Sequence, residues 1–193
     1  MRKNVQAWKS VPFLAIVLGA ILWLGASLSN PSAATDSNTE HKFKAGLAAI
    51  KEANASKDPK HPGYAEAYAL LTQLSEGRHA GAQYHVGVLH MYGLGGARFD
   101  QIAGFEMIRE AAEGGYPQAQ SYLGVLAERG DGSFKRKDEA EALAWYRKAA
   151  EGGHCYAHRR LAKAFKAGEL GLDANPEQAE TWAAKAAACA NKK

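Results

Sequence analysis

The sequence has little of what a β-sheet protein needs. Runs of Val, Ile and Thr that would form strands are scarce after residue 30, and only six prolines interrupt the 193 residues. Alanine, glycine, lysine and glutamate dominate instead, and this composition indicates helices. A chain of this length has room for one domain with a core, or for a short solenoid with a tail, and the composition favours the solenoid.

The sequence also lacks a strong charge imbalance outside its N-terminus. The formal net charge is +4, but the only charged residues among the first 34 are Arg2, Lys3 and Lys9. The remainder carries 21 basic and 20 acidic side chains, a net charge of +1. We therefore predict no nucleic-acid binding, because the basic excess that would attract phosphates is confined to the N-terminus.

One long apolar run exists, from Phe13 to Leu28, and it follows the basic N-terminus. A basic start, an uncharged apolar stretch and small residues after it are typical of an export signal, so we predict that residues 1–34 form a signal peptide or a membrane anchor. As a helix, the run would span about 24 Å, less than the roughly 30 Å of a bilayer's hydrocarbon core. We keep both alternatives: cleavage before Thr35, or retention in the membrane through residues 13–28.

No cysteine lies near the end of this run, which excludes a lipoprotein anchor. With either alternative, the basic flank stays in the cytoplasm and residues 35–193 are exported. The polar stretch 35–40 predicts a linker. We therefore predict a protein of the periplasm, free or anchored in the inner membrane and facing the periplasm.

Recognisable catalytic motifs are absent as well. No HExxH, GxSxG or Ser-x-x-Lys pattern occurs, and no glycine-rich phosphate loop follows a predicted strand. The glycines at 93, 95 and 96 lie in a predicted turn, where the backbone requires conformations that glycine adopts easily. We expect neither a catalytic site nor a cofactor.

What the sequence does contain is a repeat. The segment Ala82–Gly87 (AQYHVG) returns 37 residues later as Ala119–Gly124 (AQSYLG) and, more loosely, 38 residues after that as Ala157–Ala162 (AHRRLA). A second block recurs in the same register, at 107–115 (MIREAAEGG), 145–153 (WYRKAAEGG) and 182–187 (WAAKAA). Three copies in register indicate a repeat protein.

Each copy divides into two predicted helices, here called helix A and helix B. Helix A carries small or apolar residues at a helical spacing and ends at a glycine cluster, as at 93–96. Helix B begins at a capping residue, Asp138 in the second copy and Asn175 followed by a proline in the third. The aromatic residues of helix B, Trp145, Tyr146 and Trp182, are predicted to lie in the core.

The pattern A-x-x-x-L-G-x-x-Y-x-x-G-x-G, followed by D-x-x-x-A-x-x-W-Y-x-K-A-A-E-x-G, resembles the Sel1-like repeats, which are relatives of the tetratricopeptide repeat. The resemblance covers residues 78–191, about three units. It implies an all-α fold, a short α-solenoid of antiparallel helix hairpins, in which neighbouring hairpins share a continuous core. Upstream, residues 41–77 resemble a divergent first hairpin, with Pro59 and Pro62 in the loop between its helices.

The two cysteines leave three alternatives. Cys155 should begin the last helix A and Cys189 should end the last helix B, and these ends are neighbours in an antiparallel hairpin, so an exported chain could join them in a disulfide. Otherwise both are free thiols. A zinc site with His154 and His158 is the third alternative, but those histidines fall on variable positions that we expect at the surface, and we predict no metal site.

In tetratricopeptide repeats, helix A residues beside the packing stripe line the concave face. The resemblance therefore implies a protein-binding face made of Tyr84, Val88 and Met91 in the first unit, Ser121, Val125 and Glu128 in the second, and Tyr156, Arg159, Lys163 and Lys166 in the third. An apolar patch beside a basic end would suit a peptide with an apolar anchor and acidic residues. The alternative is that the basic residues form only a solvated face.

We therefore predict an exported scaffold or adaptor rather than an enzyme, which binds a partner protein or peptide at the cell envelope or associates with a copy of itself. Cysteine-rich members of the superfamily have been connected with penicillin binding and weak β-lactam hydrolysis, so a weak hydrolase acting on cell-wall material or β-lactams is one alternative. This chain lacks their cysteine in every repeat, and we do not transfer that activity. The resemblance also permits a quality-control adaptor in a secretory lumen.

Overall fold

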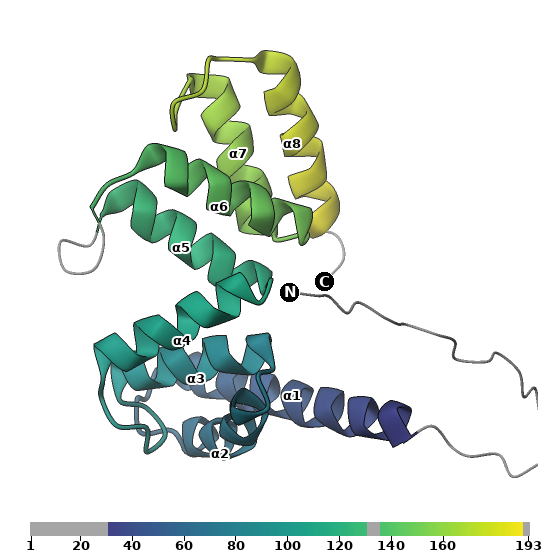
Figure 1. Cartoon of the computed structure of the whole chain (residues 1–193), viewed down its shortest axis with the longest axis vertical. Helices are drawn as coiled ribbons and strands as arrows, with labels where there is room; N and C mark the ends of the chain where they lie inside the picture. The colour runs from purple at the N-terminus through teal and green to yellow at the C-terminus, as the bar shows by residue number, and fades with distance from the viewer. Residues whose placement is uncertain (1–30, 131–135, 191–193) are drawn as a thin grey trace, which may run out of the picture.

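The structure is a stack of helix hairpins. The computed structural model describes residues 31–130 and 136–190, and this part of the chain contains eight helices and no strand. Figure 1 shows the hairpins following one another from α1–α2 at one end to α7–α8 at the other, which confirms the predicted α-solenoid. The pairs are α1 (Pro31–Ser56) with α2 (Pro62–Glu76), α3 (Ala80–Tyr92) with α4 (Gln101–Glu113), α5 (Pro117–Arg129) with α6 (Glu139–Glu151), and α7 (Cys155–Ala167) with α8 (Pro176–Ala190).

The N-terminal predictions meet the structure only in part. The apolar run Phe13–Leu28 and most of the predicted signal or anchor lie outside the described residues. Residues 35–40, which we predicted as a linker, are instead part of α1, so the helix begins earlier than the polar sequence suggested. No helix within the described part of the chain is long and apolar enough to cross a membrane.

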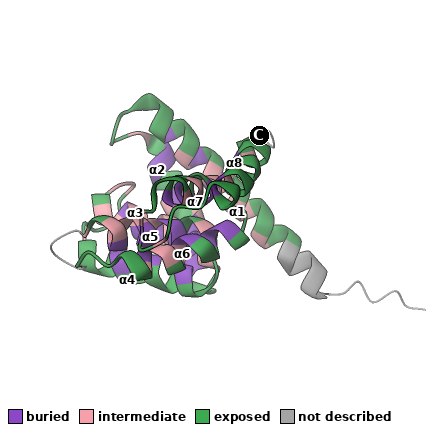
Figure 2. Ribbon diagram, turned by 90° about the horizontal axis from the view of Figure 1, so that it is seen from above, coloured by how far each residue is buried: buried purple, intermediate pink, exposed green. Residues whose placement is uncertain are grey.

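The first hairpin closes one end of the stack. Phe43 of α1 packs its ring against His79, with the ring centroids 4.4 Å apart, and it covers Gly81 at the start of α3 so closely that a side chain there would collide with it. Pro62 is the first residue of α2 rather than a loop residue, a position where its missing N–H costs nothing. The described side chains of α1 before Gly46 are exposed or half-buried, and Gly46 is the first buried position of the helix (Figure 2).

Capping residues set the start of the helices as the sequence predicted. Asp138 accepts a hydrogen bond from the backbone N–H of Glu141 at 2.8 Å, and Asn175 accepts one from Gln178 at 3.0 Å. Two histidines were not foreseen in this role: the Nδ1 atoms of His61 and His79 accept from backbone N–H groups at the starts of α2 and α3.

The two helices of each hairpin cross where both have small residues. Gly87 of α3 faces Gly104 of α4, and a Cβ added to Gly87 would lie 2.7 Å from the Gly104 carbonyl oxygen. The equivalent pairs are Gly124 with Ala142 and Ala162 with Ala179. Beside the crossing, helix B contributes a large buried residue, Ile108 in the first repeat and Tyr146 in the second. The predicted core position of Tyr146 is thus confirmed, whereas Trp145 and Trp182 are only half-buried.

Successive repeats are joined by a shared core and by a hydrogen bond from helix A. Phe105 and Ile108 of α4 lie in one apolar cluster with Ala119 and Leu123 of α5. The side-chain amide of Gln120 donates to the carbonyl of Ala112 at 3.1 Å. This carbonyl, at the end of α4, also accepts from the backbone N–H of Gly115. Ala119 and Gln120 of the second repeat are therefore part of the stacking contact.

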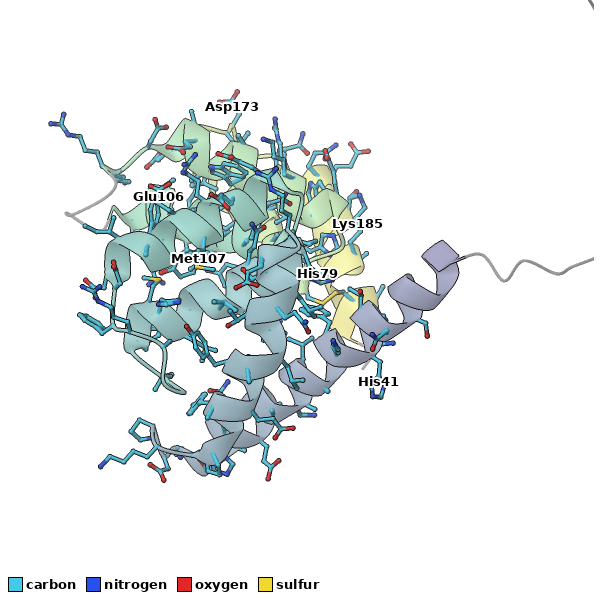
Figure 3. All side chains as sticks on the ribbon, turned by 60° about the horizontal axis from the view of Figure 1, so that its bottom comes forward. His41, His79, Glu106, Met107, Asp173 and Lys185 are labelled. Carbon is cyan, nitrogen blue, oxygen red and sulfur yellow. A yellow bond between two sulfur atoms is a disulfide. The ribbon has the colours of Figure 1, made fainter. Side chains whose placement is uncertain are left out.

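The last hairpin carries a covalent link. Cys155, at the start of α7, and Cys189, near the end of α8, form a disulfide with their Cα atoms 5.6 Å apart (Figure 3). The link closes a loop of 34 residues, and such a link stabilises a folded chain by about 2–4 kcal/mol. Of the three alternatives for the cysteines, the structure selects the disulfide.

The crossing of α3 and α4 makes a stability prediction. We expect Gly104→Ala to lower the free energy of unfolding by about 2–3 kcal/mol, because the new methyl group would collide with the backbone of α3. Urea denaturation followed by circular dichroism measures the change. Ala103→Ser, an exposed substitution on the same helix, is the matched control and should cost well under 1 kcal/mol. Equal stabilities for the two variants would contradict the close crossing.

Candidate protein-binding face

The A helices α3, α5 and α7 together present a surface that we call the A-helix face. Its central feature is an open hollow of about 330 Å³, which reaches from α3 across α5 to the start of α7. Eight residues line it: Tyr84, Gln118, Ser121, Tyr122, Val125, Arg129, His154 and Tyr156. The hollow therefore draws on all three repeats, and three of its eight lining residues are tyrosines.

An aromatic cluster supports the α3 side of the hollow. The ring of Tyr84 lies 5.5 Å from that of Tyr116 and 4.9 Å from that of His85, measured between ring centroids. His85 Nε2 and the Tyr116 hydroxyl lie at hydrogen-bond distance, 3.3 Å. Phe43 of α1 extends the cluster, with its ring 6.2 Å from His85. The first hairpin thus fixes the aromatic side chains that edge the hollow.

Burial keeps this cluster uncharged. It raises the pKa of Tyr116 to about 12 and also raises the pKa of Tyr84, because a buried phenolate is poorly solvated. For the same reason burial lowers the pKa of His85 from 6.5 to about 4. At neutral pH all three side chains are neutral, and the α3 side of the hollow is an aromatic surface with hydrogen-bonding tips.

The opposite edge carries a positive charge. Arg129, the last residue of α5, lines the hollow and forms no ion pair with any other described residue. No carboxylate is among the eight lining residues. A ligand on this surface therefore meets apolar ring faces and one basic group.

The ten residues predicted for the concave face do not form one site. Tyr84, Ser121, Val125 and Tyr156 line the hollow together. Val88 and Met91 instead pack toward the core between α3, α4 and α5, where the Met91 sulfur accepts a hydrogen bond from the Tyr122 hydroxyl at 3.7 Å. The remaining four, Glu128, Arg159, Lys163 and Lys166, lie elsewhere on α5 and α7 and do not line this hollow.

Glu128 belongs to a partly buried ionic network around Arg160. Arg160, only 8% exposed, donates to both carboxylate oxygens of Glu128 at 2.9 and 2.7 Å, and the Tyr146 hydroxyl donates to the same carboxylate. Arg160 also pairs with Glu169 at 2.9 Å, and Lys163 pairs with Glu169 at 3.2 Å. Hydrogen bonds from Arg160 hold the pKa of Glu128 below its usual range. The network joins α5, α6, α7 and the loop after α7, so its role is structural.

Sequence reasoning missed the residues that edge the hollow between repeats. Tyr116 and His154 precede α5 and α7 at equivalent positions, and both reach the A-helix face. His85, Tyr122 and Arg160 occupy the same position in the three repeats, which holds an aromatic ring in the first two and a basic side chain in the third. Comparing equivalent positions of the three repeats would have drawn attention to them, because each column contains an aromatic residue beside the packing stripe.

The histidine assignments also need correction. We expected His154 and His158 at the surface, but His158 is 7% exposed and its Nε2 lies 2.9 Å from the Ala150 carbonyl oxygen, while His154 is half-buried. His158 thus takes the place that Gln120 has in the second repeat. The disulfide occupies both cysteine sulfurs, and the described residues contain no cluster of three potential metal ligands.

Comparison with known proteins agrees with this architecture. A protein-family model described as the Sel1 repeat matches residues 80–116, 117–154 and 155–191, more than half of the chain. The chain belongs to the Sel1 repeat family. Sel1 repeat proteins generally mediate protein–protein interactions, and the family is typically not enzymatic.

Two solved Sel1-type structures resemble the chain. The crystal structure of a Sel1 repeat protein from Oxalobacter formigenes matches 62% of this chain and 88% of its own chain, with 28% sequence identity and a TM-score of 0.53. The second is c5321, a protective antigen present in uropathogenic Escherichia coli strains and displaying an SLR fold, which matches 84% of this chain with 26% identity and a TM-score of 0.57. This match covers only 33% of the antigen, so the chain spans about a third of that protein's length.

The lowered pKa of the half-buried His85 predicts a pH dependence of stability. Its pKa is about 4 in the folded state and 6.5 ordinarily, so between these values the unfolded chain binds a proton that the folded chain does not. We expect the free energy of unfolding to fall by up to about 3 kcal/mol from this residue as the pH drops from above 6.5 to about 4.

Urea denaturation at pH 7.5 and pH 4.5 measures the effect, with His85→Gln as the comparison because glutamine does not titrate. The variant should lose about 2–3 kcal/mol less stability than the wild type over this interval. The other six histidines are common to both chains and cancel in the difference. An equal loss in the two chains would show that His85 is not held neutral by burial.

Proposed function

We propose that this Sel1 repeat protein is an exported adaptor that binds a segment of a partner protein on its A-helix face. The observation that carries the proposal is the hollow formed by Tyr84, Val125 and Tyr156, because it gathers side chains from three repeats into one open aromatic surface. Tyrosine rings supply a large contact area with little loss of conformational freedom, and they are common at the centres of protein interfaces.

The rigidity of the surface supports binding. The repeats are linked by a shared core, and the Glu128–Arg160 network and the disulfide hold the third repeat. A surface that is already ordered gives up little entropy when a partner arrives. An extended segment of the partner fits this surface best. The hollow is open and crosses the three A helices, so it would not enclose a small molecule.

A hydrolase is the competing proposal, because the same hollow contains a serine and a histidine, the residue types of a nucleophile and its base. Ser121 and His154 both line the hollow, but no hydrogen bond joins them. Ser121 is 3% exposed, and none of the eight lining residues is a carboxylate that could orient the histidine. A serine that is neither accessible nor activated is a poor nucleophile, so the geometry favours binding over hydrolysis.

Export to the periplasm, with or without an inner-membrane anchor, is the second part of the proposal. The basic and apolar start of the sequence supports it, and so does the disulfide between Cys155 and Cys189, since structural disulfides persist in oxidising compartments. The same two features are compatible with a secretory lumen, the site of the quality-control alternative.

Site-specific photo-cross-linking tests the binding face. A benzophenone amino acid at position 156 should form a cross-link to a discrete partner in intact cells, while the same group at Arg147, exposed on α6, should not form it. The cross-link at position 156 should drop at least fivefold when Val125→Asp places a charge within the hollow.

Folding of each variant is checked by circular dichroism. Identical cross-links from positions 156 and 147 would remove the A-helix face as the binding surface. A cross-link only to a second copy of the chain would replace the adaptor by a self-associating protein.

Alkylation in living cells tests the export. We expect Cys155 and Cys189 to resist a maleimide until a reductant is added, whereas a chain lacking residues 1–34 should stay in the reducing cytoplasm and react at once. Mass spectrometry of the trapped protein counts the modified cysteines. Free thiols in the complete chain would contradict export to an oxidising compartment.

A further inference from the structure

A second surface lies on the outer side of the third repeat, at the open end of the stack. There α7 and α8 enclose an apolar hollow of about 410 Å³. Its floor is formed by Ala162, Ala179, Ala183 and Pro176, and its rim by Lys163, Lys166 and Glu180. We call this hollow the α7–α8 socket. It is separate from the A-helix face and does not depend on the function proposed for that face.

Comparison of the three repeats explains why no side chain of the chain itself fills the socket. Ala183 is equivalent to Ile108 in the first repeat and to Tyr146 in the second. Both of those large residues are fully buried beside the crossing of their hairpin, whereas Ala183 is exposed. The third repeat therefore has the same helix crossing, between Ala162 and Ala179, without the large side chain that fills the space next to it.

In the first two repeats, a following helix covers this surface. Phe105 and Ile108 of α4 pack with Leu123 of α5, and Tyr146 of α6 packs with Leu161 of α7. The α7–α8 socket is the third member of this series, and none of the described helices covers it. The repeat geometry therefore indicates what fits there: a helix lying where the next helix A would lie.

An alternative role for the charged rim residues Lys163, Lys166 and Glu180 is that of the polar cap that the end of a solenoid needs. Glu180 stands where the earlier repeats have Phe105 and Leu143, and Lys163 stands where they have valines. A cap of this kind would also cover its centre with long polar side chains. Here the centre is alanine and proline, and the hollow remains apolar.

We infer that the α7–α8 socket binds an amphipathic helix of a partner protein, which inserts a bulky apolar side chain into the space left by Ala183. The volume that Ile108 or Tyr146 fills in the other repeats sets the size of that side chain. Lys166, which has no ion pair with another described residue, favours a carboxylate beside it on the helix. A second copy of the chain presenting the same surface would offer only alanines and a proline as apolar side chains, and none of them is bulky enough to fill the socket.

A helix of known stacking behaviour serves as the probe. The peptide Pro117–Arg129 is α5 itself, which covers the equivalent surface of the first repeat through Leu123. Constrained as a helix and carrying phenylalanine in place of Leu123, it should bind the complete chain at least tenfold more tightly than the same peptide with alanine there. Fluorescence anisotropy of the labelled peptides gives both dissociation constants.

Two variants of the complete chain locate the binding. Ala183→Tyr places the tyrosine of the second repeat into the socket and should weaken binding of the phenylalanine peptide at least tenfold. Ala184→Tyr, one residue along on the exposed side of α8, should bind it like the wild type. Circular dichroism and thermal melting confirm that both variants are folded.

A measurement on the unsubstituted chain completes the test. With alanine methyl groups labelled with ¹³C, the phenylalanine peptide should shift the signals of Ala162, Ala179 and Ala183. Equal affinity of the two peptides, unchanged binding by Ala183→Tyr, or shifts confined to alanines outside the α7–α8 socket would each overturn the inference. None of these outcomes bears on cross-linking at position 156, so the two proposals fail separately.

Discussion

The close crossing of two helices within each hairpin is the constraint on which the rest of the structure depends. Gly87 and Gly104 let the backbones of α3 and α4 touch, and Gly124 with Ala142 does the same in the next repeat. Because the backbones are so near, one large residue of helix B suffices to fill the space beside each crossing, Ile108 in the first repeat. The next hairpin then stacks on this filled surface, as α5 does on α4.

The stacking of the hairpins determines which side chains meet on the A-helix face. Successive A helices lie side by side, so residues at equivalent repeat positions come together even though they are 37 or 38 residues apart. Packing positions stay small or apolar where a following helix covers them, as in the first two repeats, while positions beside them are free to differ. Tyr84, Ser121 and Arg159 occupy one such position in the three repeats, and an aromatic, a small and a basic residue are all accommodated there.

Features that recur in every repeat could be predicted from the sequence, whereas the burial of side chains that contact a neighbouring repeat could not. Three copies of one pattern give the fold, the caps at Asp138 and Asn175, and the position of the disulfide ends, because each rests on local spacing. The burial of Arg160 was not predictable, since a basic residue looks solvated until Glu128 of the preceding repeat is placed beside it. Met91 was assigned to the surface for a related reason: its burial comes from Tyr122 in the next repeat.

The third repeat shows what the family pattern requires and what it leaves open. Ala183 replaces the large residue of the crossing, so the hairpin loses apolar contacts that its neighbours have. The disulfide offsets part of this loss by joining the two ends of the hairpin, and the ionic network of Arg160 anchors α7 to α5. With these supports the hairpin keeps its shape without filling its own outer surface. A repeat stabilised from the inner side in this way can leave a cavity on its outer side, and such a cavity is available to a partner.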